Sequence, residues 1–453
     1  MRTIFITIFE GVEVKNILRT PILENLLKED DIRIVLFTKS VEKLDFYKKE
    51  FNDPRILFEV VEWKSKSFVD NLFAKLKFVL LRTKTTDLKR KLVCQYEKKY
   101  LRYLSGRLIN MIFAWPIFRK IARFIDFALV KDDTFKTFFD KYNPDLVFMA
   151  HLFDEPEIAM LREAKKRNIK TVGFINSWDK VTARCMLRLL PNKLIVFNNI
   201  VKKELIDFNE VMEEDVFVSG LPQYDFLYSN KVSSREDFFK KINIDPQKEL
   251  LVYASMGRAF SVSDWDMIDF LYSLKFSGKL KKDFDVLVRF QPNDFVDEEE
   301  LKKRPNLKYD LPGKRFGSKR GVDWDMNFGE LNHLHDTLFH MSILVCYASS
   351  ISIDAVVLDR PVVNIDFEIK ENPFLLKSPT QYYKTVHYKN AVDIGAISLV
   401  KSKEQLVESL NSYLLNPSLL KSERARLVRE QCVFTDGKSG ERVAKFLLQN
   451  IKS

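Results

Sequence analysis

An acid at the end of a predicted strand is the first candidate for chemistry in this sequence. Asp179 stands in the segment FINSWDKVTAR (174–184), after the strand-like run IKTVGFI, beside a tryptophan, a hydroxyl and two cations. A carboxylate within hydrogen-bonding distance of an acceptor hydroxyl can take its proton while that oxygen attacks a carbon centre. A helix cap, or an ion pair with Lys180 or Arg184, accounts for the same residue equally well. Asp179 is therefore a candidate general base with a structural alternative.

Two further strand ends carry rival bases. Glu10 and Glu13 follow the run TIFITIF, and His151 and Asp154 follow the run PDLVFMAH. Glu13 and His151 are therefore alternative catalytic residues. Arg19 lies near the same predicted rim and could bind an anionic acceptor, or it could be a solvated helix residue.

A cluster of hydroxyls predicts an anion site. In YASSISIDAVVLD, a strand-like run leads through Ser349, Ser350 and Ser352 into a predicted helix. Such a turn exposes backbone N–H groups at a helix N-terminus, where a phosphate or pyrophosphate binds. Asp354 could then contact a ribose hydroxyl. Ordinary capping needs one hydroxyl and three are present, which favours the anion site.

Two arginines could neutralise the phosphates of such a ligand. Arg258 follows the run ELLVYASM, and Arg289 ends the run FDVLVR. A departing nucleoside diphosphate needs cations or N–H donors to stabilise its growing negative charge. Arg258 and Arg289 are therefore predicted donor-binding residues.

Several other site classes are disfavoured. No GxGxxG follows the first strand and no GxxxxGK[ST] is present, which argues against a nicotinamide oxidoreductase and a P-loop NTPase. The segment LNHLHDTLFH has its histidines at spacings that no single helical face gathers, so we predict no metal site. We expect instead a loop-to-helix rim with His335 near the nucleotide. The four cysteines form no CxxC pair.

The order of predicted elements indicates an α/β protein with two domains. The chain has 453 residues, and short apolar runs alternate with helical patterns in both halves. We predict a Rossmann-like acceptor domain over 1–228, a Rossmann-like nucleotide-donor domain over 229–435, and a closing helix over 436–453. An inserted helical region, about 63–130, interrupts the first domain.

This inserted region concentrates positive charge. Residues 64–123 hold 16 Lys or Arg against three acids, while the whole chain has a net charge of +11. Its last helix, IFRKIARFIDFALV, has an apolar face opposite Arg119, Lys120, Arg123 and Asp126. We expect residues 64–123 to bind an anionic membrane surface, with a solvated helix over the first sheet as the alternative. No nucleic-acid recognition motif is present, so no nucleic-acid partner is expected.

Several segments resemble one family. SSISIDAVVLDRPVVNI resembles the donor segment of GT-B glycosyltransferases related to the CDP-glycerol glycerophosphotransferases and the surface-polysaccharide enzymes. VKNILRTPILENLLKEDDIRIVLFT, VFVSGLPQYDFL and FTDGKSGERVAKFL resemble that group's opening helix, inter-domain segment and closing helix. The resemblance implies two Rossmann-like domains facing a cleft and a nucleotide-activated donor held mainly by the C-terminal domain. It also implies no obligatory metal and no cofactor beyond that co-substrate.

Two family histidines are replaced in this sequence. The family's Trp-His-Gly segment corresponds to Trp178-Asp179-Lys180, and a second family histidine, before a proline, corresponds to Gln291. The resemblance places Gln291 at the donor and Trp178 at the acceptor. Loss of both histidines puts polyol-phosphate transfer in doubt, while an aspartate suits a sugar transfer.

The function expected from these observations is a glycosyltransferase. It would move a sugar from a nucleotide-activated donor to a lipid-linked or cell-surface glycan, in the cytoplasm, on the inner face of the cell membrane. The alternatives are a nucleotide-sugar 2-epimerase-like enzyme, a polyol-phosphate transferase of the CDP-glycerol type, and a non-catalytic glycan-binding member.

Overall fold

The computed structural model describes residues 1–62, 67–229, 231–316, 324–373 and 375–451. The chain forms two compact units. Unit 1 contains residues 1–87, 99–228 and 432–453, and unit 2 contains residues 88–98 and 229–431. After the inserted region, the chain passes from unit 1 into unit 2 at residues 228–229. It returns to unit 1 at residue 432 for its last segment.

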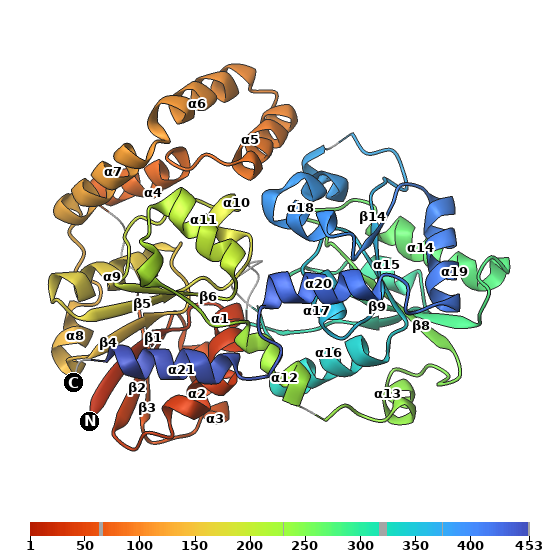
Figure 1. Ribbon diagram of the computed structural model, residues 1–453, viewed down its shortest axis with the longest axis horizontal. Helices are drawn as coiled ribbons and strands as arrows, with labels where there is room; N and C mark the ends of the chain where they lie inside the picture. Colours follow the sequence, from red (N-terminus) through yellow and green to blue (C-terminus); the bar gives the residue numbers. More distant parts are fainter. Residues whose placement is uncertain (63–66, 230, 317–323, 374, 452–453) are drawn as a thin grey trace. The chain divides into compact units, whose positions relative to one another are not determined.

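Unit 1 is built on a seven-stranded parallel sheet in the order β3-β2-β1-β4-β5-β6-β7 (Figure 1). Its strands are rich in apolar residues, as expected for a parallel sheet that helices cover on both faces. A buried hydrophobic cluster lies on each face. The strands are β1 (Arg2–Thr7), β2 (Ile32–Thr38), β3 (Ile56–Val60), β4 (Leu146–Met149), β5 (Lys170–Phe174), β6 (Lys193–Val196) and β7 (Val216–Val218).

The helices of unit 1 follow the expected alternation. The chain leaves β1 through a single helical turn, α1 (Gly11–Glu13), closed by a capping box between Glu10 and Glu13. The other helices of this unit outside the insertion are α2 (Pro21–Leu26), α3 (Val41–Glu50), α8 (Lys136–Tyr142), α9 (Glu155–Lys166), α10 (Lys180–Ala183), α11 (Asn199–Asn209), α12 (Asp225–Ser229) and α21 (Ser439–Asn450).

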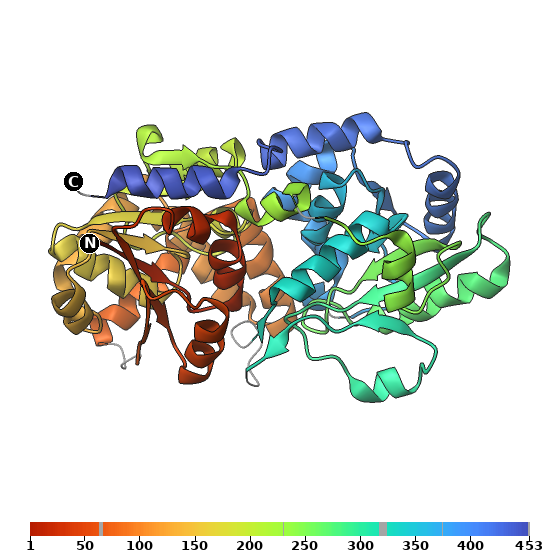
Figure 2. The same cartoon turned by 90° about the horizontal axis from the view of Figure 1, so that it is seen from below.

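The closing helix α21 is part of unit 1. It packs against α2. Figure 2 shows α21 running along α2, on one side of the unit 1 sheet. The buried carboxylate of Asp225 accepts hydrogen bonds from the backbone N–H groups of Ser439 and Gly440, at 3.0 and 2.6 Å. A Cβ at Gly440 would lie 3.0 Å from Pro21, so this close approach favours glycine. The C-terminal segment is thus fixed to the N-terminal sheet.

The inserted region is helical in the structure. It contains α4 (Phe68–Val79), α5 (Lys84–Glu97), α6 (Tyr100–Phe113) and α7 (Pro116–Leu129), shown in orange in Figure 1. Residues 63–66, where we predicted its start, lie outside the described residues. Pro116 is the first residue of α7, a position where its missing N–H costs nothing.

The orientation of α7 is opposite to our prediction. Arg119 and Arg123 are buried, and both pair with Glu210, Arg123 at 2.8 Å. Asp126 is buried as well and accepts from Arg162 and Arg188 at 2.6 and 2.8 Å. These charges can be buried because each has an oppositely charged partner. The expectation that Arg119 and Arg123 face a membrane is therefore wrong; Lys120 alone of the three cations is exposed.

Unit 2 has a six-stranded parallel sheet in the order β10-β9-β8-β13-β14-β15. One buried cluster joins β8, β9 and β13 to the helices on that face. The strands are β8 (Glu249–Ala254), β9 (Phe284–Arg289), β10 (Lys308–Asp310), β13 (Ile343–Cys346), β14 (Val362–Ile365) and β15 (Ser398–Val400), with a separate antiparallel pair, β11 (Lys314–Arg315) and β12 (Trp324–Asp325).

The helices of unit 2 alternate with these strands. They are α13 (Arg235–Lys241), α14 (Asp264–Ser277), α15 (Glu298–Lys302), α16 (Phe328–His340), α17 (Ile351–Val357), α18 (Val386–Asp393), α19 (Lys403–Leu415) and α20 (Lys421–Cys432). Across the described residues of both units, no helix has the length and apolar character to cross a bilayer.

Candidate functional site

A buried group of titratable side chains lies at the carboxyl end of the unit 1 sheet. Glu13 comes from the turn after β1, His151 follows β4, and Glu157 lies in the first turn of α9. All three are at most 1% exposed, and one ligand-type atom of each lies within 4.8 Å of those of the other two. The structure thus brings together two of the predicted catalytic residues, Glu13 and His151, with a third that the sequence analysis did not single out.

Burial sets the protonation of this group. Loss of hydration raises the pKa of Glu13 to about 8, with a smaller contribution from the negative charge of Glu10. Burial also raises the pKa of Glu157 well above its usual range and lowers the pKa of His151 well below its usual range. At neutral pH the three side chains are therefore mainly uncharged.

Charged residues surround the buried imidazole. The Nζ atom of Lys180 lies 3.0 Å from Nε2 of His151, and Asp154 Oδ2 lies 3.6 Å from its Nδ1. Arg184 pairs with Asp154. The positive charge of Lys180 is the second cause, after burial, of the lowered pKa of His151.

Glu13, His151 and Glu157 have the donor types and spacing that could hold a divalent cation. The ammonium of Lys180 beside His151 opposes a second positive charge there. Oε1 of Glu13 and Oε2 of Glu157 have no hydrogen-bond partner among the described residues. Protonated carboxyl groups explain such atoms without a metal, and the absence of a metal remains a prediction.

Asp179 lies in the loop between β5 and α10. It occupies the N-cap position of α10, but its side chain makes no capping hydrogen bond. Instead, Oδ1 of Asp179 accepts a hydrogen bond from Ser177 Oγ at 2.5 Å. Asp179 as a whole residue is half-buried. Its negative charge adds to burial in raising the pKa of Glu204, on α11, to about 8.

The two predicted acceptor-binding residues have structural contacts. Trp178 is half-buried and packs against the hydrophobic cluster of unit 1. Arg19 is buried and makes a two-pronged ion pair with Glu50, at 2.7 Å for both bonds. Because its guanidinium has no exposed surface, the prediction that Arg19 meets an acceptor at the rim is wrong.

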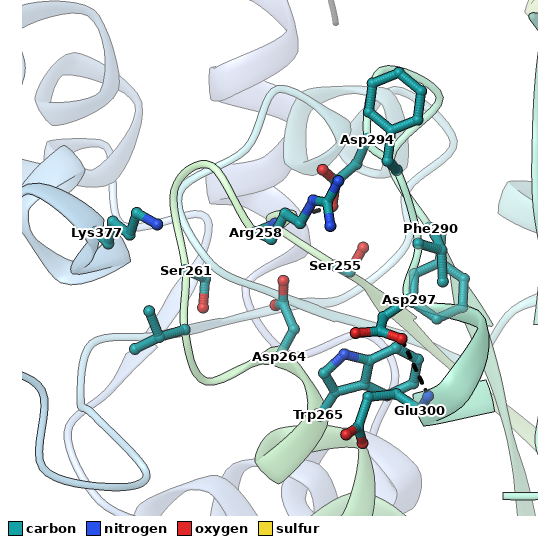
Figure 3. Close-up of a pocket in the computed structure, with 13 residues that line it drawn as sticks. Ser255, Arg258, Ser261, Asp264, Trp265, Phe290, Asp294, Asp297, Glu300 and Lys377 are labelled. Atoms are coloured by element: carbon teal, nitrogen blue, oxygen red, sulfur yellow. Dashed lines mark hydrogen bonds between the residues drawn. The ribbon is translucent and has the colours of Figure 1, made fainter. Parts of the chain in front are cut away.

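A cavity of about 320 Å³ lies at the carboxyl ends of β8 and β9 in unit 2 (Figure 3). Its wall combines aromatic side chains with cations and carboxylates. Ligand pockets in parallel α/β sheets occur at this end of the strands. The lining includes Ser255, Arg258, Ser261, Asp264, Trp265, Phe290, Asp294 and Lys377.

The loop after β8 is held in place around this cavity. Buried Asp264 accepts from Tyr253 Oη at 2.6 Å and from the N–H of Gly257 at 2.8 Å. Gly257 has φ of +84°, and a Cβ there would lie 2.8 Å from Asp294 Oδ2, so this position requires glycine. Arg258, an exposed residue, lies next to this turn, and its backbone N–H donates to Oδ2 of Asp294 at 2.9 Å. Arg258 is thus a cation in a fixed loop.

The serine turn differs from the expected anion cradle. Ser350 is exposed and Ser349 half-buried, at the start of α17. Ser352 is fully buried, and its hydroxyl lies 2.9 Å from Tyr388 Oη and donates to Asn364 at 3.2 Å. The N–H groups of Ser352 and Asp354 donate to the carbonyls of Ser349 and Ser350. Ser352 is therefore part of the core, and only the earliest part of the turn is suited to a ligand.

A second cavity contains Arg289 together with Asp310 and His333, to which the sequence analysis gave no role at the donor. Arg289 is buried and pairs with Asp310 at 3.2 Å, and His333 Nε2 lies 2.9 Å from the same carboxylate. Burial lowers the pKa of Arg289. These three side chains line a cavity of about 330 Å³. Asp310 and His333 are far from Arg289 in sequence, and no spacing pattern connects them.

Of the two remaining predicted donor-binding residues, His335 is buried and Gln291 is half-buried. The segment LNHLHDTLFH lies within α16, which begins with a capping box at Asn327, so it is not a loop-to-helix rim. His335 is 2% exposed, and burial lowers its pKa. The expectation that His335 lies on an open rim is wrong, because the helix turns it inward. Gln291 is half-buried after β9, and its Oε1 would lie 2.9 Å from a Cβ at Gly257.

Comparison with known proteins identifies the family. Residues 170–449 match the family described as CDP-glycerol:poly(glycerophosphate) glycerophosphotransferase. This chain belongs to that family. The match spans residues 229–431 of unit 2 and the strands β5, β6 and β7 of unit 1, and the chain is a GT-B transferase-family protein. No curated protein matches the chain by sequence.

Solved structures share the fold over the whole chain. UDP-GlcNAc 2-epimerase from Neisseria meningitidis, bound to UDP-GlcNAc, is 11% identical with a TM-score of 0.58, covering 99% of this chain and 100% of its own. The wall teichoic acid polymerase TagF, soaked with CDPG, is 12% identical with a TM-score of 0.52, at 99% and 88% coverage. A glycosyltransferase from Rickettsia africae is 14% identical with a TM-score of 0.50, at 99% coverage of both chains. At sequence identities this low, the similarity shows a shared fold and nothing more specific.

Proposed function

We propose that this protein is a glycosyltransferase that uses a nucleotide-activated sugar and extends a lipid-linked or cell-surface glycan. The observation that carries the proposal is the cavity at the carboxyl ends of β8 and β9, where Arg258 and Lys377 stand beside aromatic side chains. Such a wall suits a nucleotide, with cations for the phosphates and an aromatic surface for the base. Family membership supports a nucleotide-linked donor, and the neighbour structures were solved with UDP-GlcNAc and CDPG.

We assign acceptor activation to Asp179 in unit 1. The carboxylate of this half-buried residue takes the proton of the acceptor hydroxyl while that oxygen bonds to the anomeric carbon. The bond from that carbon to the nucleoside diphosphate breaks, and the leaving phosphate takes the electron pair. Arg258 and Lys377 stabilise this negative charge. Ser177 orients the carboxylate through its hydrogen bond to Oδ1. No step requires a metal.

The acceptor also defines the proposed location. A lipid-linked glycan acceptor would bring the protein to the inner face of the cell membrane. The basic inserted region, which we predicted to bind an anionic membrane surface through residues 64–123, would make the contact. This part of the proposal is independent of the base, since it involves the inserted region and not Asp179.

A nucleotide-sugar 2-epimerase is the second candidate. The observation that favours it is the group formed by Glu13, His151 and Glu157, whose protonatable atoms lie within 4.8 Å of one another. Epimerisation at a carbon needs a base and an acid, which such a group could supply. Polyol-phosphate transfer and glycan binding without turnover remain as further alternatives.

Incubation of the purified protein with a panel of nucleotide sugars, with and without an acceptor glycolipid, separates these functions. A transferase releases nucleoside diphosphate when the acceptor is present and lengthens the acceptor. An epimerase converts the nucleotide sugar to its epimer without any acceptor. Glycerol-phosphate incorporation from CDP-glycerol would favour polyol-phosphate transfer, and binding without any product would favour the non-catalytic alternative.

A further inference from the structure

Two buried polar atoms on the wall of the cavity at β8 and β9 have no hydrogen-bond partner among the described residues. They are Oγ of Ser255, directly after β8, and Oδ1 of Asp294, in the loop after β9. Each residue is 7% exposed, and Figure 3 shows both among the side chains that line the cavity. Buried polar atoms in folded proteins almost always have a partner. Two open atoms in one cavity therefore indicate a ligand that supplies their partners.

Other polar groups of the same wall are satisfied by the protein itself. Both carboxylate oxygens of Asp264 accept hydrogen bonds from neighbouring residues. Oγ of Ser261 accepts from the backbone N–H of Ser263 at 3.0 Å. The open atoms are therefore a specific property of Ser255 and Asp294 and not a general property of this wall.

The carboxylate of Asp294 is held in one orientation. Its Oδ2 accepts a hydrogen bond from the backbone N–H of Arg258 at 2.9 Å. The backbone N–H of Asp294 donates to the carbonyl of Gln291 at 3.0 Å, and its own carbonyl accepts from the guanidinium of Arg315. These bonds fix the loop and leave Oδ1 as the remaining acceptor. A side chain held in this way loses little conformational freedom when a ligand binds.

The two open atoms define the chemistry of the group that binds them. A carboxylate oxygen can only accept, so the partner of Asp294 must be a donor, whereas the hydroxyl of Ser255 can donate or accept. Since the two atoms are not bonded to each other, each needs its own partner. Among the described residues, the group with metal-ligand spacing lies in unit 1, at Glu13, His151 and Glu157, which disfavours a metal ion here. Hydroxyl groups on a sugar ring meet both requirements.

We propose that Asp294 Oδ1 and Ser255 Oγ bind two hydroxyl groups of the nucleotide-sugar donor and select the donor by these hydroxyls. The inference rests on the proposed function, because that function places the donor in this cavity. The hydroxyls come from the ribose of the nucleotide or from the transferred sugar, and the chemistry of recognition is the same for both. A ligand without them leaves a buried carboxylate oxygen unpaired and should bind more weakly.

The test is to measure dissociation constants of the full chain by isothermal titration calorimetry. The ligands are UDP, CDP and GDP, the dideoxyribose analogue of each, and the conjugates UDP-glucose, UDP-GlcNAc, CDP-glucose and GDP-mannose. In Asp294→Asn the amide oxygen can keep the bond from Arg258, so the NH2 donor replaces the open acceptor. Ser255→Ala removes the second contact. Asp283→Asn, at an exposed acid of unit 2 that pairs with Lys248, is the control for the lost charge.

We expect the wild-type protein and Asp283→Asn to bind a ligand with the recognised hydroxyls at least about tenfold more tightly than its counterpart without them. Asp294→Asn should lose this preference, and Ser255→Ala should reduce it. If the ribose is recognised, the preference is for the ribonucleotide over its dideoxyribose analogue. If the transferred sugar is recognised, the preference is for a conjugate over the bare nucleotide, and the dideoxyribose analogue binds like the ribonucleotide.

Three results would overturn the inference. The first is a wild-type protein that binds nucleotides without either preference. The second is a preference that both Asp294→Asn and Ser255→Ala retain, because the open atoms would then hold only water. The third is an equal loss of affinity for every ligand, which would mean that the substitutions disturb the loop and remove no hydroxyl contact. The thermal midpoint without ligand reports whether each variant is folded, and Ser255→Ala alone decides if Asp294→Asn is not.

The same measurements distinguish this inference from the proposed function. A wild-type protein that binds none of the ligands would overturn both, since no donor would occupy the cavity. Nucleotide binding that does not depend on Asp294 or Ser255 would overturn only the hydroxyl contact and leave the donor cavity in place.

Discussion

The ammonium of Lys180 lies 3.0 Å from Nε2 of His151, at the centre of a buried group that burial keeps mainly uncharged. A positive charge at this distance disfavours protonation of the imidazole, in the same direction as burial. The imidazole of His151 is therefore neutral at physiological pH, because its pKa lies well below its usual range. This relationship separates the buried group from Asp179, a half-buried residue that bonds to Ser177.

Glu13→Gln is expected to stabilise the protein at alkaline pH and to change little at acidic pH. The pKa of Glu13 is about 8 in the folded protein, against an ordinary value of 4.5. Between these values the folded state holds a proton that the unfolded state releases. The contribution of Glu13 to stability therefore falls by up to about 1.4 kcal/mol per pH unit as pH rises, and glutamine removes this loss.

Urea unfolding of Glu13→Gln from about pH 5 to about pH 9 checks this expectation, with Glu24→Gln at an exposed site as the control. A stability difference from wild type that does not vary with pH would contradict the assigned pKa.

Arg119→Ala and Lys120→Ala should differ strongly, although the two residues are neighbours. Arg119 is buried and pairs with Glu210, which keeps Arg123 as its second partner when Arg119 is removed. The loss of a buried, charged hydrogen-bond donor should still cost about 1–3 kcal/mol. Lys120 is exposed, and its replacement should change the free energy of unfolding by less than about 0.5 kcal/mol. Denaturant unfolding measures both values. Similar, small effects would mean that α7 does not bury its polar face.

This contrast shows what the sequence could and could not establish. The spacing in 117–128 predicts two faces, but it cannot tell which face meets the protein, because that depends on partners such as Glu210 and Leu187. The strand runs were predicted because burial on both sides makes them continuously apolar. The strands β3, β10, β11, β12 and β15 were not predicted.

Single residues were harder to place than elements. Arg19 finds Glu50 across 31 positions, and Arg289 finds Asp310 across 21, and neither contact leaves a spacing signal. Ser352 carries the same hydroxyl as Ser350, yet only the structure shows that it faces Asn364 in the core. Glu13 and His151 were identified individually from their strand ends, while Glu157 was not.

Asp179→Asn should abolish sugar transfer and leave donor binding nearly unchanged. Asparagine keeps the size of the side chain but cannot take a proton, and loss of a general base costs about 10²–10⁴-fold in turnover. Transfer assays and nucleotide thermal shifts measure the two properties. Asp207→Asn, at an acid of α11 that pairs with exposed Lys203, is the control. Turnover above about a tenth of the wild-type rate would remove Asp179 as the base.

Chelation should leave transfer unchanged if the group formed by Glu13, His151 and Glu157 holds protons and not a metal. We expect dialysis against EDTA to alter neither turnover nor the thermal midpoint, because Lys180 already supplies the positive charge there. Elemental analysis of the purified protein gives a direct reading. A stoichiometric divalent metal that is lost in Glu13→Gln would show that the site is a metal centre.

The most direct test of the central claim is nucleotide binding by the cavity at β8 and β9. The measurement is the thermal midpoint of the wild-type protein and of Arg258→Ala with UDP, CDP, GDP, dTDP, CMP and their sugar conjugates, with exposed Lys281→Ala as the control. We predict that at least one nucleotide raises the midpoint of the wild-type and control proteins, and that Arg258→Ala weakens its binding at least about tenfold. A midpoint that no nucleotide or conjugate changes, or an equal shift in Arg258→Ala, would contradict the assignment of the donor to this cavity.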